Sequence, residues 1–348
     1  DYYGALIDAL ETVGRFKRGE PGEPVPSNDR RRYYVLLYDW RKENLEAVRQ
    51  LHALIEQIRR DYGDPDLPVD ILAHSNGGLI ANYYLRYGPT DVLDQDVFTP
   101  WDEGAHRIRR MVLLGTPNLG SVISLERLQK GFKIAWRTVP VEVLVTFATP
   151  FETLPHPDAK VIHGPDGERV DLNIYSVDTW RRNRWGVFSP EVEARVLAAA
   201  HGPETGALQL AALHATFARH LERARKLHMA LSEPIHSHGV EVALFGGDCT
   251  LTPGRAVLDE KNGLRSLVVR PEEVQARVDG VDYERLLMQP GDGLVTRDSQ
   301  LGRGRVEGMG AAYDSYPFAQ TFFLCERHDQ LSVNPYFQNN LLHFLLSR

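Results

Sequence analysis

Strand-length apolar runs alternate with helical patterns over the first third of the chain. Each run is continuously apolar and too short for a helix, which is typical of a strand buried on both faces of a sheet. Strands are predicted at residues 33–38, 69–73 and 108–114, and helices at 1–14, 43–62 and 77–87. Such alternation is typical of right-handed crossovers, so the sequence predicts an α/β fold with a mostly parallel sheet flanked by helices.

The alternation stops after residue 120. Helical patterns at 125–135, 190–200 and 206–231 follow, with a hairpin-like stretch at 161–172 around Pro165-Asp-Gly167. Strands are predicted again at 240–245 and 320–324, before a last helix at 335–346. We therefore expect residues 1–120 and 236–348 to form two parts of one core, and residues 121–235 to form an inserted, mainly helical cap.

Composition excludes several functional classes. The net charge of −7 argues against nucleic acid as the main partner, because phosphate binding requires a basic face. No window reaches the roughly 18 consecutive apolar residues of a membrane span. The residues given contain no signal peptide, so we expect a cytoplasmic location, and the oligomeric state stays open.

Cys249 and Cys325 are the two cysteines of the chain. Two cysteines are too few for a disulfide framework or a thiolate metal site. They could pair if their strands are neighbours, but we expect two isolated buried thiols.

Ser75 lies between a predicted strand and a predicted helix, in Ala73-His-Ser-Asn-Gly77. A tight strand-to-helix turn presents a serine hydroxyl at the top of the sheet, and small residues two before and two after it avoid a Cβ clash. The motif alone is common, so it needs an acid and a histidine to carry chemistry. The backbone N–H of Asn76 is expected to be one donor to an oxyanion.

A base and an acid can be sought at the ends of the later strands. His328 follows the strand at 320–324 and is the candidate base. His74 is expected to pack or to line the pocket, whereas His236 and His238 precede a strand, at the wrong end.

Two aspartates compete for the acid. Asp248 directly follows the strand at 240–245, and Asp292 lies between glycines in Pro290-Gly-Asp-Gly293. Spacing does not separate them, and each could equally form an Asx turn beside a glycine.

With these motifs in view, the chain resembles the lecithin:cholesterol acyltransferase and lysosomal phospholipase family of α/β-hydrolases. The resemblance covers most of the chain but is weak across the predicted cap. The residues that carry it are Tyr38-Asp-Trp-Arg41, Ala73-His-Ser-Asn-Gly-Gly78, Gly115-Thr-Pro117, Thr252-Pro253, Gly291-Asp-Gly-Leu-Val-Thr296 and His328.

The resemblance implies an α/β-hydrolase fold in which Ser75 is the nucleophile, Asp292 the acid and His328 the base. It implies acyl-ester chemistry on lipids, by hydrolysis or by transfer to an alcohol, without a metal or cofactor. The partners implied are a lipid or ester substrate and a membrane or lipid surface. The family's first strand and its glycine-rich loop, which supply the second oxyanion donor, would lie before Asp1.

Two other functions remain open from the sequence. One is a carboxylesterase or thioesterase for small soluble substrates, which would use the same three residues. The other is a non-catalytic module of this fold that binds a lipid or a protein.

Overall fold

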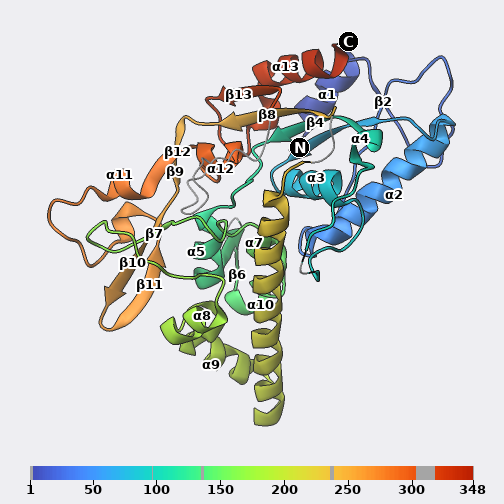
Figure 1. Cartoon of the computed structure of the whole chain (residues 1–348). Helices are drawn as coiled ribbons and strands as arrows, with labels where there is room; N and C mark the ends of the chain where they lie inside the picture. The colour runs from blue at the N-terminus through green and yellow to red at the C-terminus, as the bar shows by residue number, and fades with distance from the viewer. Residues whose placement is uncertain (1–2, 96, 135–136, 236–238, 303–317, 348) are drawn as a thin grey trace.

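A four-stranded parallel sheet forms the centre of the computed structural model, which describes residues 3–95, 97–134, 137–235, 239–302 and 318–347 (Figure 1). Its strand order is β13 (Gln320–Leu324), β8 (Glu241–Gly247), β4 (Ile108–Leu114) and β3 (Val69–His74). All three neighbouring pairs are parallel. The predicted α/β class and parallel sheet are confirmed.

Helices cover both faces of this sheet. On one face lie α2 (Asn44–Tyr62) and α3 (Asn76–Tyr87), and on the other lie α1 (Gly4–Thr12) and α13 (Pro335–Leu346) (Figure 1). Successive residues of β4 point to opposite faces, so Leu113 packs with the first pair of helices and Leu114 with the second. Because both faces are covered, the strand is continuously apolar.

The helix α2 shows how local chemistry sets an element's end. It begins at Asn44 and ends at Tyr62, and Gly63 follows in a left-handed conformation with φ of 63°. The Gly63 N–H caps the carbonyls of Arg59 and Arg60. Glycine adopts this conformation without a Cβ penalty, which is why the predicted helix end is accurate.

The predicted strand at 33–38 is wrong. The strand β2 comprises Arg32–Tyr33, which pairs with β1 (Lys17–Arg18), and residues 34–39 have no regular secondary structure. Val35 is 45% exposed and Leu37 is 83% exposed, so the run is not buried on both faces. An extended apolar segment becomes a buried strand only when neighbouring strands pair with it, and no described strand pairs with residues 34–38.

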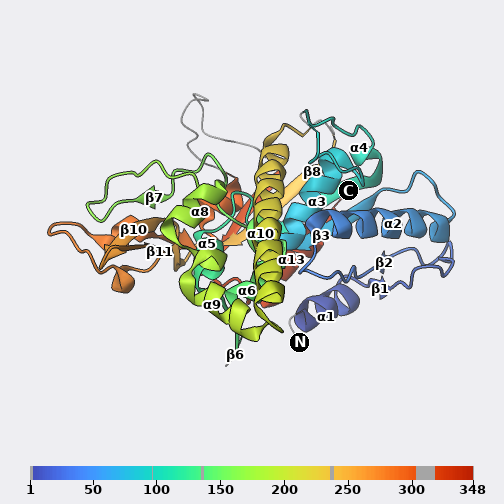
Figure 2. The same cartoon turned by 90° about the horizontal axis from the view of Figure 1, so that it is seen from below.

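The segment between β4 and β8 leaves the sheet and forms several helices and short strands. Its long helix α10 stands between the core helices α2 and α3 and the other helices of the segment (Figure 2). The elements in order are α5 (Val122–Lys130), β5 (Phe132–Ile134), β6 (Arg137–Val139), α6 (Val141–Leu144), α7 (Thr149–Glu152), β7 (Ile162–His163), α8 (Val177–Asn183), η1 (Gly186–Phe188), α9 (Pro190–Ala199) and α10 (Pro203–Ser232).

Most elements predicted in this segment are present. The helices α9 and α10 and the turn around Pro165-Asp-Gly167 confirm the sequence pattern, since His163 bridges to Arg169 in antiparallel fashion. The predicted helix at 125–135 is wrong beyond residue 130. Gly131, with φ of 86°, ends α5, and the next residues form the hairpin β5–β6.

The β4–β8 segment has an apolar core of its own, built on Phe151, Trp180 and Phe217. This core also contains Ala256 and Leu267, which come after β8. The division into a core of 1–120 with 236–348 and a cap of 121–235 therefore stays a prediction.

The remaining elements lie outside the central sheet. No helix in the described part of the chain combines the length and the apolar composition needed to cross a membrane. The elements are α4 (Gly104–Arg107), β9 (Thr250–Pro253), β10 (Ala256–Lys261), β11 (Leu264–Val268), η2 (Pro271–Glu273), α11 (Tyr283–Leu287), β12 (Met288–Gly291), α12 (Arg297–Leu301) and η3 (Leu331–Val333).

Glu152 is a buried acid where the β4–β8 segment meets α2. It is 6% exposed, and its two carboxylate oxygens accept the backbone N–H of Asn44 at 3.0 and 3.2 Å. Burial raises the pKa of Glu152 to about 8, and the nearby Glu43 acts in the same direction. The N–H of Asn44 and the charge of Arg223 oppose the shift without cancelling it.

This pKa makes stability depend on pH. Because it lies above the ordinary value of 4.5, the folded chain binds the proton more tightly than the unfolded chain. The stabilisation is complete below the ordinary value and is lost as the pH rises through about 8. Glutamine at position 152 cannot ionise. We therefore expect the melting temperature of Glu152→Gln to fall less than that of the wild type between about pH 6 and about pH 9.

The control is Glu46→Gln in α2, which alters an exposed ion pair with Lys42, a residue just before that helix. Its melting temperature should follow the wild-type pH trend. A wild type and a Glu152→Gln variant with parallel pH trends would contradict the prediction.

Candidate active site

Ser75 occupies a strained turn between β3 and α3. Its φ of 54° and ψ of −126° place a non-glycine residue in a region that costs about 1–3 kcal/mol. Two backbone hydrogen bonds hold it there: the Ser75 N–H donates to Leu114 at 2.8 Å, and the Ser75 carbonyl accepts from Gly78 at 2.9 Å. The sheet and the helix thus fix the serine from both sides.

Small residues allow this turn to form. A Cβ added to Gly77 would lie 3.9 Å from the Cβ of Ala73, an ordinary contact, so alanine is accommodated in the first small position. A Cβ on Gly78 would lie 1.9 Å from Oγ1 of Thr116. Only glycine lets α3 approach the end of β4 so closely, which links two motifs that are far apart in the sequence.

Ser75, His328 and Asp292 form a continuous series of hydrogen bonds. His328 Nε2 lies 2.9 Å from Ser75 Oγ, and His328 Nδ1 lies 2.8 Å from Asp292 Oδ2. The backbone N–H of His328 also donates to the carbonyl of Asp292 at 2.8 Å. The structure therefore brings together the three residues that the sequence proposes as nucleophile, base and acid, and their catalytic roles stay a prediction.

The carboxylate of Asp292 is oriented by its own loop. Its Oδ1 accepts the backbone N–H groups of Leu294 at 2.9 Å and Val295 at 2.7 Å, which leaves Oδ2 for the imidazole. The Asp292 side chain has no exposed surface, whereas that of His328 is 12% exposed. The acid is shielded from water, while the imidazole stays accessible.

Gly115 leaves room for the contact between the base and the acid. It has a φ of 57°, and an added Cβ would lie 3.2 Å from His328 Nδ1 and 3.3 Å from Asp292 Oδ2. The same atom would lie 2.8 Å from Leu331. The first residue of the Gly-Thr-Pro motif is thus a glycine for reasons of both conformation and space.

His74 packs beside the site, as expected from the sequence. Its ring lies 5.0 Å from that of His328 between centroids, and its Nδ1 shares a hydrogen bond of 2.9 Å with the hydroxyl of Tyr3. Burial lowers the pKa of His74 to about 4, so the ring is neutral at neutral pH. His236 and His238 lie outside the described residues.

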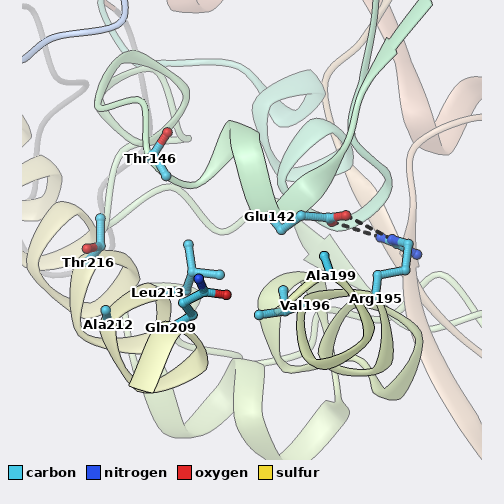
Figure 3. A pocket seen from close by; sticks show the side chains of 9 residues that line it. All are labelled: Glu142, Thr146, Arg195, Val196, Ala199, Gln209, Ala212, Leu213 and Thr216. Atoms are coloured by element: carbon cyan, nitrogen blue, oxygen red, sulfur yellow. Dashed lines mark hydrogen bonds and ion pairs between the residues drawn. The ribbon is translucent and has the colours of Figure 1, made fainter. Parts of the chain in front are cut away.

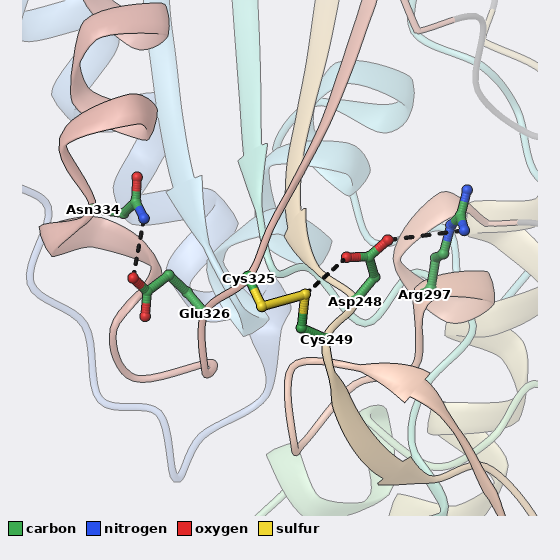
Figure 4. Close-up of a disulfide and its surroundings, with 6 residues drawn as sticks. All are labelled: Asp248, Cys249, Arg297, Cys325, Glu326 and Asn334. Atoms are coloured by element: carbon green, nitrogen blue, oxygen red, sulfur yellow. Dashed lines mark hydrogen bonds and ion pairs between the residues drawn. A yellow bond between two sulfur atoms is a disulfide. The ribbon is translucent and has the colours of Figure 1, made fainter.

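Asp248, the alternative acid, points elsewhere. Its carboxylate lies 3.8 Å from the guanidinium of Arg297, beside Cys249 (Figure 4). Its described contacts do not include His328. The two aspartates that spacing could not separate are thus distinguished by their neighbours.

Cys249 and Cys325 form a disulfide, so the expectation of two isolated thiols is wrong (Figure 4). Their Cα atoms are 4.9 Å apart because β8 and β13 are adjacent, with Gly247 opposite Leu324. Cys325 directly follows this parallel pairing, and Cys249 lies two residues beyond it. The bond closes the two strand ends just before the loop that carries His328.

The backbone N–H of Asn76, the expected oxyanion donor, lies at the start of α3, and this role stays a prediction. Asn76 is the first residue of α3, where an amide has no carbonyl partner within the helix. No second donor is assigned among the described residues. No group of three or more metal-ligating side chains is found in the same part of the chain.

Two cavities lie away from these residues. One, of about 470 Å³, is lined by α6, α9 and α10, with the Glu142 and Arg195 ion pair at its side (Figure 3). The other, of about 370 Å³, lies between the start of α2 and α10. Neither is lined by Ser75, Asp292 or His328.

Asn44 was missed by the sequence reasoning, although its side chain contacts that of Asn76. It closely follows Tyr38-Asp-Trp-Arg41, at the start of a helix. Nothing in its sequence context distinguishes it from an ordinary first residue of a helix, because the contact depends on how α2 packs against α3.

Comparisons with known proteins support the resemblance. The family model described as lecithin:cholesterol acyltransferase matches residues 31–148, which include Ser75. Among solved structures, "The crystal structure of Tle4-Tli4 complex" has a TM-score of 0.55 and 16% sequence identity, over 94% of this chain and 72% of that chain. No curated protein sequence matches significantly.

These comparisons confirm the resemblance to the lecithin:cholesterol acyltransferase family over residues 31–148 and the α/β-hydrolase fold. The family match supports a hydrolase or acyltransferase of the lipase type that acts on lipids.

Proposed function

We propose that this chain is a serine hydrolase or O-acyltransferase that acts on lipid or other hydrophobic carboxylic esters through an acyl-enzyme. The observation that carries the proposal is the hydrogen-bonded series from Asp292 through His328 to Ser75. A free serine hydroxyl is hardly nucleophilic at neutral pH, and an adjacent imidazole with an orienting carboxylate is the usual means of activating it.

In the proposed reaction, His328 Nε2 accepts the proton of Ser75 Oγ as the oxygen attacks the ester carbonyl carbon. Asp292 stabilises the imidazolium that forms, and the N–H of Asn76 donates to the tetrahedral oxyanion. Collapse of this intermediate breaks the ester bond, and His328 returns the proton to the leaving alcohol. Water or a second alcohol then attacks the acyl-enzyme, again with His328 as base, and releases an acid or a new ester.

These steps need neither a metal nor an organic cofactor. The family match supports a lipid substrate, and a membrane or lipid surface is proposed as a partner on the same ground. The Cys249–Cys325 disulfide favours an oxidising compartment over the cytoplasmic location expected from the sequence, because disulfides persist mainly where thiols are not kept reduced.

A fluorophosphonate probe tests the nucleophile. We expect it to add one covalent phosphonyl group to the wild type, on Ser75, because the probe reacts with serines that a neighbouring base activates. Intact-mass and peptide mass spectrometry measure the addition and its position. Ser75→Ala should remain unmodified, and Ser347→Ala, which alters a serine at the end of α13, should be labelled like the wild type.

If the folded wild type is not labelled at Ser75 and hydrolyses no ester, the enzyme proposal fails. That result would favour a non-catalytic module of this fold.

The acid is tested by a matched pair of substitutions. We expect Asp292→Asn to lower kcat about 10³–10⁴-fold on a p-nitrophenyl ester, because an amide cannot hold the imidazole in the required tautomer. Asp248→Asn should change kcat by less than about threefold, since it alters only an outlying contact with Arg297. The reverse result would assign the acid to Asp248.

Acyl-chain length tests the substrate class. We expect kcat/KM on p-nitrophenyl esters to rise from short to long acyl chains, because each buried methylene contributes up to about 0.8 kcal/mol. The values of kcat/KM are measured from initial rates at ester concentrations below the critical micelle concentration of each ester. A strict preference for short chains would favour a carboxylesterase or thioesterase for small soluble substrates.

A further inference from the structure

The side chain of Asn76 is held by a reciprocal amide pair. Asn44 Nδ2 donates to Asn76 Oδ1 at 3.0 Å, and Asn76 Nδ2 donates to Asn44 Oδ1 at 2.7 Å. The hydroxyl of Tyr38 accepts a second, longer hydrogen bond from Asn76 Nδ2 at 3.4 Å. Both polar atoms of the Asn76 side-chain amide are therefore hydrogen-bonded within the protein.

Asn44 is itself fixed at both its side chain and its backbone. It is 2% exposed, and its backbone N–H donates to Glu152 at the end of α7. The first turns of α2 and α3 share one apolar cluster, in which Leu45 packs with Leu79 and Ile80. A chain of contacts thus runs from α7 through α2 to the first residue of α3.

We propose that Asn44 is a positioning residue that fixes the oxyanion donor, the backbone N–H of Asn76, through the side-chain amide pair. The inference rests on the proposed function. Glu152 anchors Asn44 from the β4–β8 segment, so two successive contacts, from Glu152 to Asn44 and from Asn44 to Asn76, connect that segment to the turn at Ser75.

The geometry explains why such a residue is needed. The peptide group between Ser75 and Asn76 carries the N–H of Asn76, and its orientation depends on the backbone angles of Ser75. Because Ser75 has an unfavourable conformation, with φ of 54°, contacts from the surrounding structure must hold this peptide group in place. The two reciprocal amide hydrogen bonds restrain both the position and the orientation of the Asn76 side chain. An apolar contact would restrain only its distance from Asn44. An oxyanion donor must lie within hydrogen-bond reach of the developing charge, and a misplacement of about 1 Å can cost about a hundredfold in rate.

A double-mutant cycle tests this inference. Asn44→Leu and Asn76→Leu each remove the amide pair but keep the backbone N–H of residue 76 and a side chain of similar volume. We expect each single variant to lower kcat on a p-nitrophenyl ester by about 10- to 100-fold with KM within about twofold of wild type. The double variant should lose no more than the single variants, because both changes remove the same interaction.

A second readout tests the oxyanion donor without relying on turnover of an ester. The rate of phosphonylation of Ser75 by the fluorophosphonate should fall in parallel with kcat, since the phosphonyl oxygen uses the same donor. Asn44→Asp, which replaces the donor to Asn76 Oδ1 by a carboxylate oxygen that repels it, should lower kcat at least as much as Asn44→Leu. Glu152→Ala removes the carboxylate that accepts the backbone N–H of Asn44, and it should also lower kcat.

The control is Glu46→Gln, in the same turn of α2 as Asn44, and it should retain wild-type kcat. An Asn44→Leu variant with wild-type kcat would overturn the inference while leaving the proposed function intact. Losses that add in the double variant, or that appear in KM rather than kcat, would also overturn it. A wild type that is neither labelled nor active would remove the proposed function, and the inference with it.

Discussion

The strained conformation of Ser75, with its positive φ, is the constraint on which the rest of the site depends. A serine with φ of 54° persists only where the surrounding structure holds it. Here the end of β4 receives its N–H, the first turn of α3 donates to its carbonyl, and Gly78 admits Thr116 at a distance that no other residue allows. The sheet, the helix and the spacing of the glycines therefore act together to hold Ser75 in this conformation.

The base and the acid of the site come from two different sheets. Parallel strands end at one edge, so the loop after β13 brings His328 to Ser75 at the end of β3. Asp292 follows β12, which pairs with β9 in a separate antiparallel sheet, and it contacts His328. The Cys249–Cys325 disulfide joins the ends of β8 and β13 and restrains the histidine loop at its start.

The β4–β8 segment shares an apolar core with residues that follow β8, and it also contacts the sheet helices through buried polar groups. Glu152 accepts the first N–H of α2, and Asn44 pairs with the first residue of α3. Burying an acid such as Glu152, whose pKa is raised, costs free energy. In return, the buried polar groups make directional hydrogen bonds near Ser75, which an apolar contact would not provide.

Local patterns in the sequence determined β3, β4, α2 and α3, because strand and helix periods and the Gly63 cap act within a few residues. The order of motifs along the chain and the family resemblance also identified Ser75, His328 and Asp292 as the candidate nucleophile, base and acid. Tertiary structure decided what depends on neighbours across the chain. No strand in the described part of the chain pairs with residues 34–38. Cys249 meets Cys325 because β8 adjoins β13, and Asn44 meets Asn76 because α2 packs on α3. Such pairings are set by the arrangement of elements, which no single stretch of sequence encodes.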